Sequence, residues 1–141
     1  MSTEQIIKAK LKWPVSIKAN GSSSDGVTLT LSTNGAYIRC AKPLRLYEIF
    51  DMTLQVPNSD DSIEAEVEVV FSNIYGPDDQ ISPRGMGVRF LEISSEDRKI
   101  IAKAVLQQLQ SDKVEIDPKS LQTLQTLTIE PNEIGSEAAL R

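Results

Sequence analysis

The fold is decided by the stretch Ile63–Val69, which reads IEAEVEV. Successive side chains of a β-strand point to opposite faces, so this strict alternation places the apolar side chains on one face and three carboxylates on the other. The pattern predicts a half-buried β-strand, with one face in a core and the other in water.

Similar strand-like runs lie on both sides of this stretch. They are Val15–Ile17, Val27–Leu31, Tyr37–Ile38 and Met52–Val56. Residues typical of turns separate the runs, at 20–26, 34–35, 57–58, 76–79 and 82–85. Several short strands at this spacing predict a mainly β fold, a small antiparallel barrel or sandwich, because closing a sheet removes its exposed edges.

Beyond Ile93 the apolar pattern changes its period. Ile101, Val105 and Leu109 recur every four residues, and Ser94 followed by Asp97 is a plausible N-terminal cap. This pattern predicts one helix over residues 94–110 that packs on the barrel. The order of elements divides the chain into a flexible basic segment (1–12), the barrel (13–93), the helix (94–110) and an acidic tail (111–141) that is partly ordered or disordered.

The tail carries Leu121, Leu124 and Leu127 at intervals of three residues. Two interpretations stay open for this stripe of leucines. It forms a helix that docks on the barrel or on a partner protein, or it belongs to a mostly mobile tail.

Length and composition limit the class of protein. A chain of 141 residues suffices for one domain with its own core, and 40% apolar and 25% charged residues are typical of globular proteins. The net charge of −5 argues against DNA or RNA as a partner, because phosphate binding needs an excess of lysine and arginine. No apolar run approaches the roughly 20 residues of a spanning helix, and no export signal is recognised, so we expect a cytoplasmic protein without membrane insertion.

The sequence offers little for catalysis or for metal binding. It contains no histidine, the commonest general base and zinc ligand. The single Cys40 excludes an internal disulfide, and its place in a strand-like run predicts a buried structural thiol. The acidic run at 58–62 lacks the ligand spacing of a calcium loop and is typical of a polar turn. We therefore expect no catalytic residues, no metal, no cofactor and no enzymatic activity.

Two segments instead favour a binding site for an anion. The first places Lys8 and Lys12 shortly before Trp13, and the second, Thr30–Gly35, ends an apolar run with hydroxyls and a glycine turn. Lysines supply positive charge and turn amides supply hydrogen-bond donors. Any anion that this acidic protein binds must therefore be held by the local positive charge and amide donors of these segments.

In this order the segments resemble those of the PilZ domain family, bacterial β-barrels followed by a helix that act as receptors for cyclic di-GMP. The matching features are a basic pair four residues apart before Pro14-Val15, a Ser-x-x-Gly turn at 32–35, and Gly87–Phe90 ahead of the capped helix. The resemblance covers residues 8–110 and implies a PilZ-like barrel that binds cyclic di-GMP. It places the ligand at Lys8 and Lys12, facing Thr30, Ser32 and Gly35.

The ligand motif is degenerate at three of its positions. The family's two arginines are Lys8 and Lys12 here, and an ammonium cannot form the two parallel hydrogen bonds that a guanidinium makes to guanine. Thr30 stands where the family has Asp or Asn, so a hydroxyl replaces the acceptor for guanine N–H groups. Trp13, Arg39 and Arg84 are the candidates for compensation, although a lone tryptophan at a strand start is more often part of a core.

Two functions follow from the resemblance. The first is a non-enzymatic signalling module in bacterial cyclic di-GMP regulation that binds the nucleotide through KxxxK and TxSxxG and is read by an unknown partner protein. The alternative is a PilZ-like adaptor that has lost the nucleotide and binds a partner protein through the leucine stripe. An oligonucleotide-binding barrel is disfavoured by the acidic balance and by the scarcity of aromatic residues for base stacking.

Overall fold

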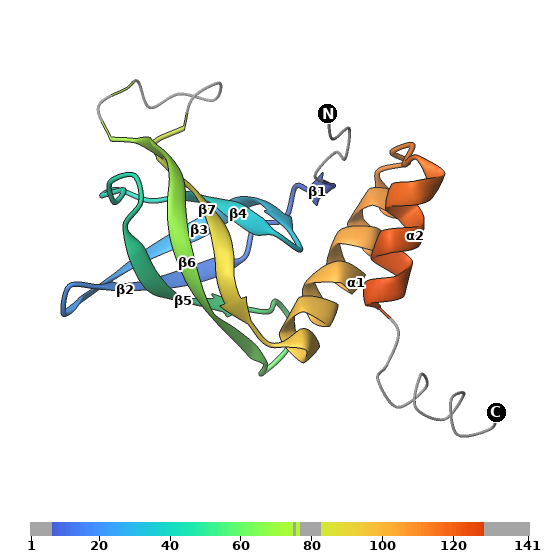
Figure 1. Cartoon of the computed structure of the whole chain (residues 1–141), viewed down its shortest axis with the longest axis horizontal. Coiled ribbons are helices and arrows are strands. Elements are labelled where there is room, and N and C mark those ends of the chain that lie inside the picture. The colour runs from blue at the N-terminus through green and yellow to red at the C-terminus, as the bar shows by residue number, and fades with distance from the viewer. Residues whose placement is uncertain (1–6, 75, 77–82, 129–141) are drawn as a thin grey trace.

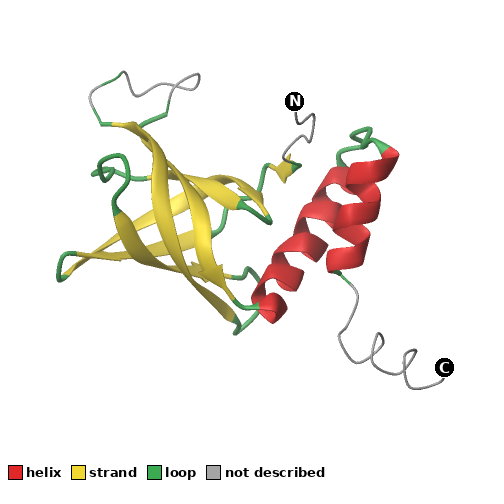
Figure 2. Cartoon of the chain, in the orientation of Figure 1, coloured by secondary structure: helices red, strands yellow, loops and turns green. Residues whose placement is uncertain are grey.

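The computed structural model describes residues 7–74, 76 and 83–128. These residues form strands and two helices, shown along the chain in Figure 1 and by type in Figure 2. The strands are β1 (Lys8–Ala9), β2 (Pro14–Ala19), β3 (Ser22–Ser32), β4 (Gly35–Arg39), β5 (Ile49–Gln55), β6 (Ser62–Asn73) and β7 (Gly85–Ile93). The helices are α1 (Ser95–Ser111) and α2 (Pro118–Leu127).

The sheet closes into an antiparallel barrel, as the sequence predicts. Among the described residues the strands follow the order β3-β2-β5-β6-β7-β4, and β4 then pairs with β3 to complete the ring. The short β1 lies outside the ring and pairs with the end of β3. The predicted strand Ile63–Val69 forms the middle of β6, and Ile63, Val67 and Val69 are completely buried.

Local turn chemistry connects β2 to β3. Asn20 and Gly21 have positive φ angles of 53° and 77°, as a two-residue type I′ turn requires. The strands continue this register directly, with Ala19 opposite Ser22. The turn predicted at 20–26 is therefore tighter than expected, because β3 already begins at Ser22. Residues 77–79 of the turn predicted at 76–79, and residue 82 of the turn predicted at 82–85, lie outside the described residues.

The first helix begins where the sequence predicts it. Ser94 caps α1 by accepting a hydrogen bond from the backbone N–H of Asp97 at 3.1 Å. Ile101, Val105 and Leu109 all lie on the buried face of the helix. The predicted period of four therefore identifies the side of α1 that packs against the rest of the core.

A second helix lies within the acidic tail. Asp117 caps α2 by accepting hydrogen bonds from Ser120, and Pro118 occupies the first turn. The helix packs against α1, and the two run side by side next to the barrel in Figure 1. Leu124 is only 3% exposed and belongs to the main core. In the described ranges, neither helix is long and apolar enough to cross a membrane.

Candidate functional site

A buried threonine holds the basic N-terminal segment along the barrel. The Thr28 hydroxyl donates a hydrogen bond to the Leu11 carbonyl at 2.5 Å and accepts one from the Trp13 N–H at 2.8 Å. The Thr28 N–H also donates to the Trp13 carbonyl at 2.9 Å. Just before this anchor, Lys8 pairs in register with Ser32, so β1 brings the first motif beside the second.

The second motif builds its own turn. The Ser32 hydroxyl accepts hydrogen bonds from the N–H groups of Asn34 and Gly35, both at 3.1 Å, and it donates to the Gly35 carbonyl at 3.3 Å. Ser32 is 5% exposed. A side chain at Gly35 would overlap the Val88 carbonyl oxygen, so only glycine lets β4 approach β7 here. Both residues therefore have a structural task in shaping this turn.

A cavity of about 340 Å³ lies where the two motifs meet. Lys8, Thr30, Ser32 and Gly35 all line it, which brings together four of the five predicted site residues. Lys12, the fifth, is exposed and does not belong to the lining. The Thr30 hydroxyl makes no hydrogen bond to another described residue, so it is available to a ligand.

The cavity has a residue that the sequence analysis missed. Arg89 lies opposite Gly35 in the pairing of β7 with β4, and it lines the cavity together with Lys8. Its Nε donates to Glu68 at 2.7 Å, and its side chain is 58% exposed. The terminal guanidinium nitrogens make no hydrogen bond within the described part of the chain. The sequence does give a weak signal, because alternation along Gly87–Phe90 directs Arg89 away from the buried Val88.

An aromatic residue forms another wall of the cavity. Tyr37 lines the cavity, and its hydroxyl donates a hydrogen bond to the Pro83 carbonyl at 2.7 Å. The Tyr37 ring contacts Phe71 at a centroid distance of 6.1 Å. The ring is thus held in place at both its tip and its side, as a rigid apolar surface against which a planar group can pack.

The candidates for compensation lie elsewhere. Trp13 is 5% exposed and belongs to the core, so the core interpretation is confirmed and the stacking role is wrong. Arg39 pairs with Gly85 at the far end of β4, four residues from Gly35 and hence about 13 Å along the strand. Arg84 precedes Gly85 at that same end, so neither arginine reaches the cavity.

The predicted structural role of Cys40 is confirmed. Its thiol is free, and the residue is 7% exposed. Burial raises the pKa of the Cys40 thiol, and a backbone hydrogen bond from Lys42 opposes this effect. A raised pKa keeps the sulfur protonated at neutral pH, which disfavours it as a nucleophile.

Comparison with known proteins identifies the same fold. A family model of the PilZ domain matches residues 8–107. The structure of the Bacillus subtilis inhibitor of motility (MotI/DgrA) has a TM-score of 0.65 at 16% identity, and the match covers 82% of this chain and 55% of that one. The PilZ domain of YcgR from Escherichia coli, solved with c-di-GMP, has a TM-score of 0.59 at 12% identity, covering 79% and 95% of the two chains. No curated protein sequence matches the chain.

The first of these structures sets a limit on the comparison. The chain spans only about half the length of MotI/DgrA, because the match covers 55% of that chain. At such low identity the likeness shows the fold alone. What the residues of this chain bind must therefore be argued from the cavity itself.

Proposed function

Because the chain belongs to the PilZ domain family, we propose that it is a non-enzymatic signalling module that binds cyclic di-GMP in the cavity between β1 and the 32–35 turn. The observation that carries this proposal is the convergence of Lys8, Thr30, Ser32 and Gly35 on one cavity from two separate segments. In addition, the structure of a PilZ domain with a similar fold was solved with this nucleotide.

The charges of the cavity suit a nucleotide with phosphates and purine bases. Lys8 and Arg89 are the cations among the described lining residues. Lys8 provides a point charge for a phosphate, whereas the planar guanidinium of Arg89 is suited to the paired acceptors on the edge of guanine. In this proposal Arg89 supplies the guanidinium that the lysine substitutions remove from the first motif.

The remaining motif residues have different tasks. Thr30 offers its hydroxyl to the ligand, and the rigid Tyr37 ring packs against a base. Ser32 acts indirectly, because its hydroxyl is occupied by hydrogen bonds within the turn. Lys12 contributes only its positive charge, because it does not line the cavity and Thr28 fixes the residues on either side of it.

The first test is a calorimetric titration of the full chain with cyclic di-GMP, with GTP and cyclic di-AMP as controls for simple anion attraction. We expect selective binding. Lys8→Ala and Arg89→Ala should each weaken it by about 10- to 100-fold, the equivalent of one lost charge-assisted hydrogen bond. Lys10→Ala is the matched control, because Lys10 is exposed near Lys8 but does not line the cavity.

The alternative function, an adaptor that has lost the nucleotide, is tested by restoring the family motif. A variant with Lys8→Arg, Lys12→Arg and Thr30→Asp regains the arginine pair and the acidic acceptor. If this variant binds cyclic di-GMP more tightly than the wild type does, the result supports a single pocket that serves both the native and the restored residues. Binding by the variant alone, with none by the wild type, contradicts the receptor proposal and favours the adaptor.

The burial of the leucine stripe argues against it as the contact surface of such an adaptor. Leu124 is buried within the chain, and Leu121 and Leu127 are half-buried on the same helix. Since α2 packs against α1, the stripe serves contacts within the protein. A surface for a partner protein must be sought elsewhere.

A further inference from the structure

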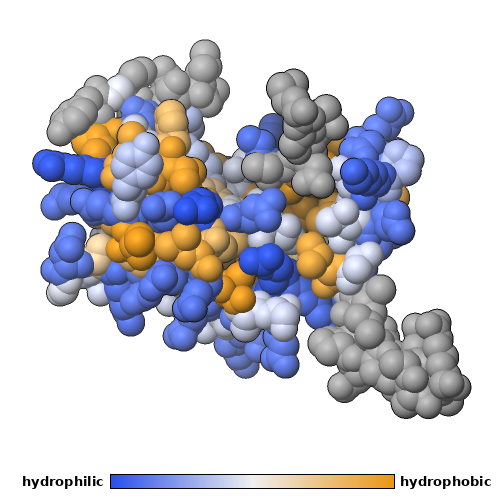
Figure 3. All heavy atoms as spheres, in the orientation of Figure 1, coloured by the Kyte–Doolittle hydropathy of each residue, from blue (hydrophilic) through white to orange (hydrophobic). Residues whose placement is uncertain are grey.

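Large apolar side chains gather on the outer face of the barrel, away from the helices. This apolar patch consists of Tyr47, Ile49, Val70 and Phe71, which are 75%, 55%, 49% and 56% exposed. Figure 3 shows apolar side chains on the face that carries β6 and β7, crossed by a hydrophilic row. Clustered exposure of this kind is typical of protein interaction sites, whereas single exposed apolar residues are ordinary.

Hydrogen bonds hold the patch together across two strands. The Tyr47 N–H donates to the Val69 carbonyl at 2.8 Å, and the Val69 N–H donates to the Glu48 carbonyl at 2.9 Å. Ile49 then pairs with Glu68, so the segment from Tyr47 to Ile49 runs alongside β6 in register. The backbone beneath the patch is therefore fixed, so a partner can bind without rearranging these strands.

The backbone of Tyr47 is strained while its side chain projects into water. Its φ angle is 71°, in the left-handed region that bulky residues rarely adopt. Such conformations cost about 1–3 kcal/mol and are concentrated at functional sites. Tyrosine is also enriched among the residues that dominate binding energy in interfaces. Folding alone gains little from this side chain, because 75% of the residue is exposed.

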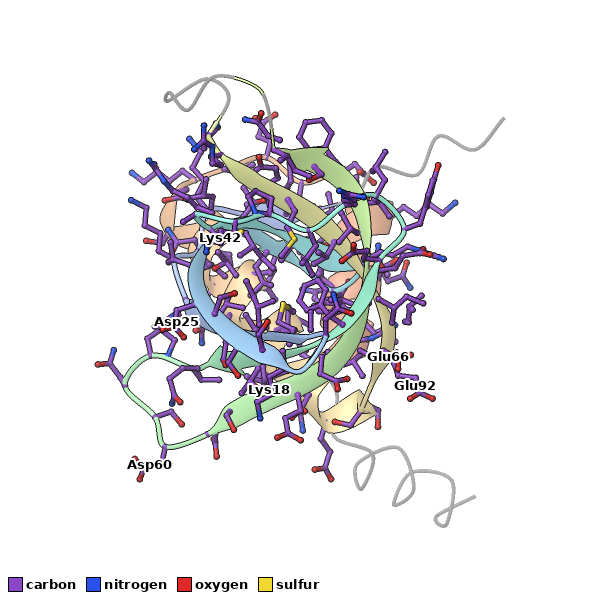
Figure 4. The ribbon with its side chains drawn as sticks, turned by 90° about the vertical axis from the view of Figure 1, so that its left-hand side faces the viewer. Lys18, Asp25, Lys42, Asp60, Glu66 and Glu92 are labelled. Atoms are coloured by element: carbon purple, nitrogen blue, oxygen red, sulfur yellow. The ribbon has the colours of Figure 1, made fainter. Side chains whose placement is uncertain are left out.

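A row of carboxylates borders the apolar patch. Asp51 of β5 pairs in register with Glu66 of β6, and Glu66 pairs with Glu92 of β7. Figure 4 shows Glu66 and Glu92 pointing outward from the barrel beside each other. Like charges directly opposite one another destabilise a sheet, so the Asp51–Glu66 and Glu66–Glu92 pairs lower the stability of the protein. Lys18 of β2 lies opposite Asp51 and offsets this repulsion at one end of the row only.

The acidic row lies in a broad concavity of about 750 Å³. Glu64 adds a fourth acidic side chain to its lining, against two basic ones, Lys18 and Arg98. On β5 the acidic row lies next to Ile49, and on β6 the Glu68–Arg89 ion pair lies between Glu66 and Val70. A partner that covers both surfaces must present apolar and basic side chains together.

We propose that this face of β5, β6 and β7 docks a basic amphipathic helix of a partner protein. Ile49 and Asp51 lie two residues apart on one face of β5, a separation of about 7 Å. A helix with its side chains is about 10 Å wide, so its apolar stripe can cover Ile49 and Tyr47 while its basic flank reaches Asp51 and Glu66. The inference rests on the proposed signalling role. Tyr47, Ile49 and the acidic row do not line the nucleotide cavity, whereas Val70 of the patch does.

The test uses the full chain without nucleotide and a fluorescently labelled synthetic helix with a leucine face and a lysine face. A second helix with glutamate in place of lysine is the matched probe. We expect fluorescence anisotropy to show binding of the lysine helix only, weakening as salt rises. Equal binding of both helices, or no binding of either, overturns the proposal, and neither result bears on cyclic di-GMP.

Two variants address the two parts of the surface. Tyr47→Asn removes the aromatic ring and suits a positive φ, so the fold is kept. Glu66→Lys places a cation between Asp51 and Glu92 and should raise the melting temperature. We expect each to weaken helix binding by about tenfold or more. Val114→Ser and Asp60→Lys are the controls, because Val114 is exposed elsewhere and Asp60 lies in the 57–61 turn, away from Glu66 and Glu92 in Figure 4.

The same variants also test whether a second copy of the chain covers the patch. In sedimentation experiments the wild type should be a monomer when no helix is added. A dimer that Tyr47→Asn converts to a monomer overturns the partner-helix proposal in favour of self-association. If both Tyr47→Asn and Glu66→Lys bind the helix as tightly as the wild type, the helix does not bind at this face and the proposal is overturned.

Discussion

The hydroxyl of Ser32 accepts a hydrogen bond from the N–H of Gly35 at 3.1 Å, so two residues of the ligand motif stabilise each other. The same hydroxyl accepts a hydrogen bond from Asn34. This wall of the cavity is therefore formed by the chain itself, before any ligand is present. A turn with this sequence is required by the barrel as much as by a ligand.

Removing the hydroxyl should therefore affect stability first. Ser32→Ala leaves the buried Gly35 N–H without its side-chain acceptor, which costs about 1–3 kcal/mol. Urea unfolding followed by circular dichroism measures this loss. Ser62→Ala is the control, because Ser62 is exposed at the start of β6. An unchanged unfolding midpoint for Ser32→Ala would show that the hydroxyl contributes nothing to the turn.

Gly35 is predicted to be intolerant of any side chain. In Gly35→Ala the new methyl group meets the Val88 carbonyl, so β4 must move away from β7 at a cost of about 1–3 kcal/mol. Thermal unfolding of the variant should show the loss. Gly87→Ala is a suitable comparison, because its methyl group would lie 3.4 Å from the Phe71 Cβ, an ordinary contact. Equal melting temperatures for the two variants would contradict the steric argument.

The local features of this fold can be predicted from sequence. The alternation in Ile63–Val69 and the period of four in α1 identify buried faces, because each depends only on neighbours along the chain. The Ser32–Gly35 turn is equally local. The family resemblance then supplies the closure of the barrel, which no single strand pattern contains.

The contribution of Arg89 could not be predicted in the same way. Alternation shows that Arg89 faces outward, but its position beside the cavity depends on the pairing of Arg89 with Gly35, which lies far away in sequence. The docking of α2 is also non-local. Leucines at intervals of three suit a helix on this protein or on a partner, and only the contact between α1 and α2 decides between them.

Thr28 should control the order of the basic segment. Thr28→Val keeps the shape of the side chain but removes the hydrogen bonds to Leu11 and Trp13, at a cost of about 1–3 kcal/mol. Amide hydrogen exchange should become faster at Trp13, and cyclic di-GMP binding should weaken with it. Thr123→Val is the control, because the Thr123 hydroxyl bonds within exposed α2. If hydrogen exchange at Trp13 is unchanged, the pairing of β1 with β3 is enough to anchor the basic segment without the Thr28 hydroxyl.

The buried leucine of α2 should determine whether that helix docks. Leu124→Ala removes a core side chain, and such changes cost about 2–5 kcal/mol when the whole structure must respond. We expect a smaller loss of global stability but a clear release of α2, seen as protease cleavage between the two helices. Leu46→Ala serves as the control, because Leu46 is 49% exposed on the barrel. Protection equal to that of the wild type would mean that α2 is held by other contacts.

The Cys40 thiol should make the protein less stable at high pH. Burial raises its pKa in the folded state above the ordinary 9.0, so the folded protein retains a proton that the unfolded chain releases. The stabilisation is complete below pH 9.0 and is lost as the pH rises through the folded-state pKa. Urea unfolding at increasing pH should therefore show a falling stability that is less steep in Cys40→Ala. Parallel curves for the two proteins would mean that the thiol ionises as easily in the barrel as in water.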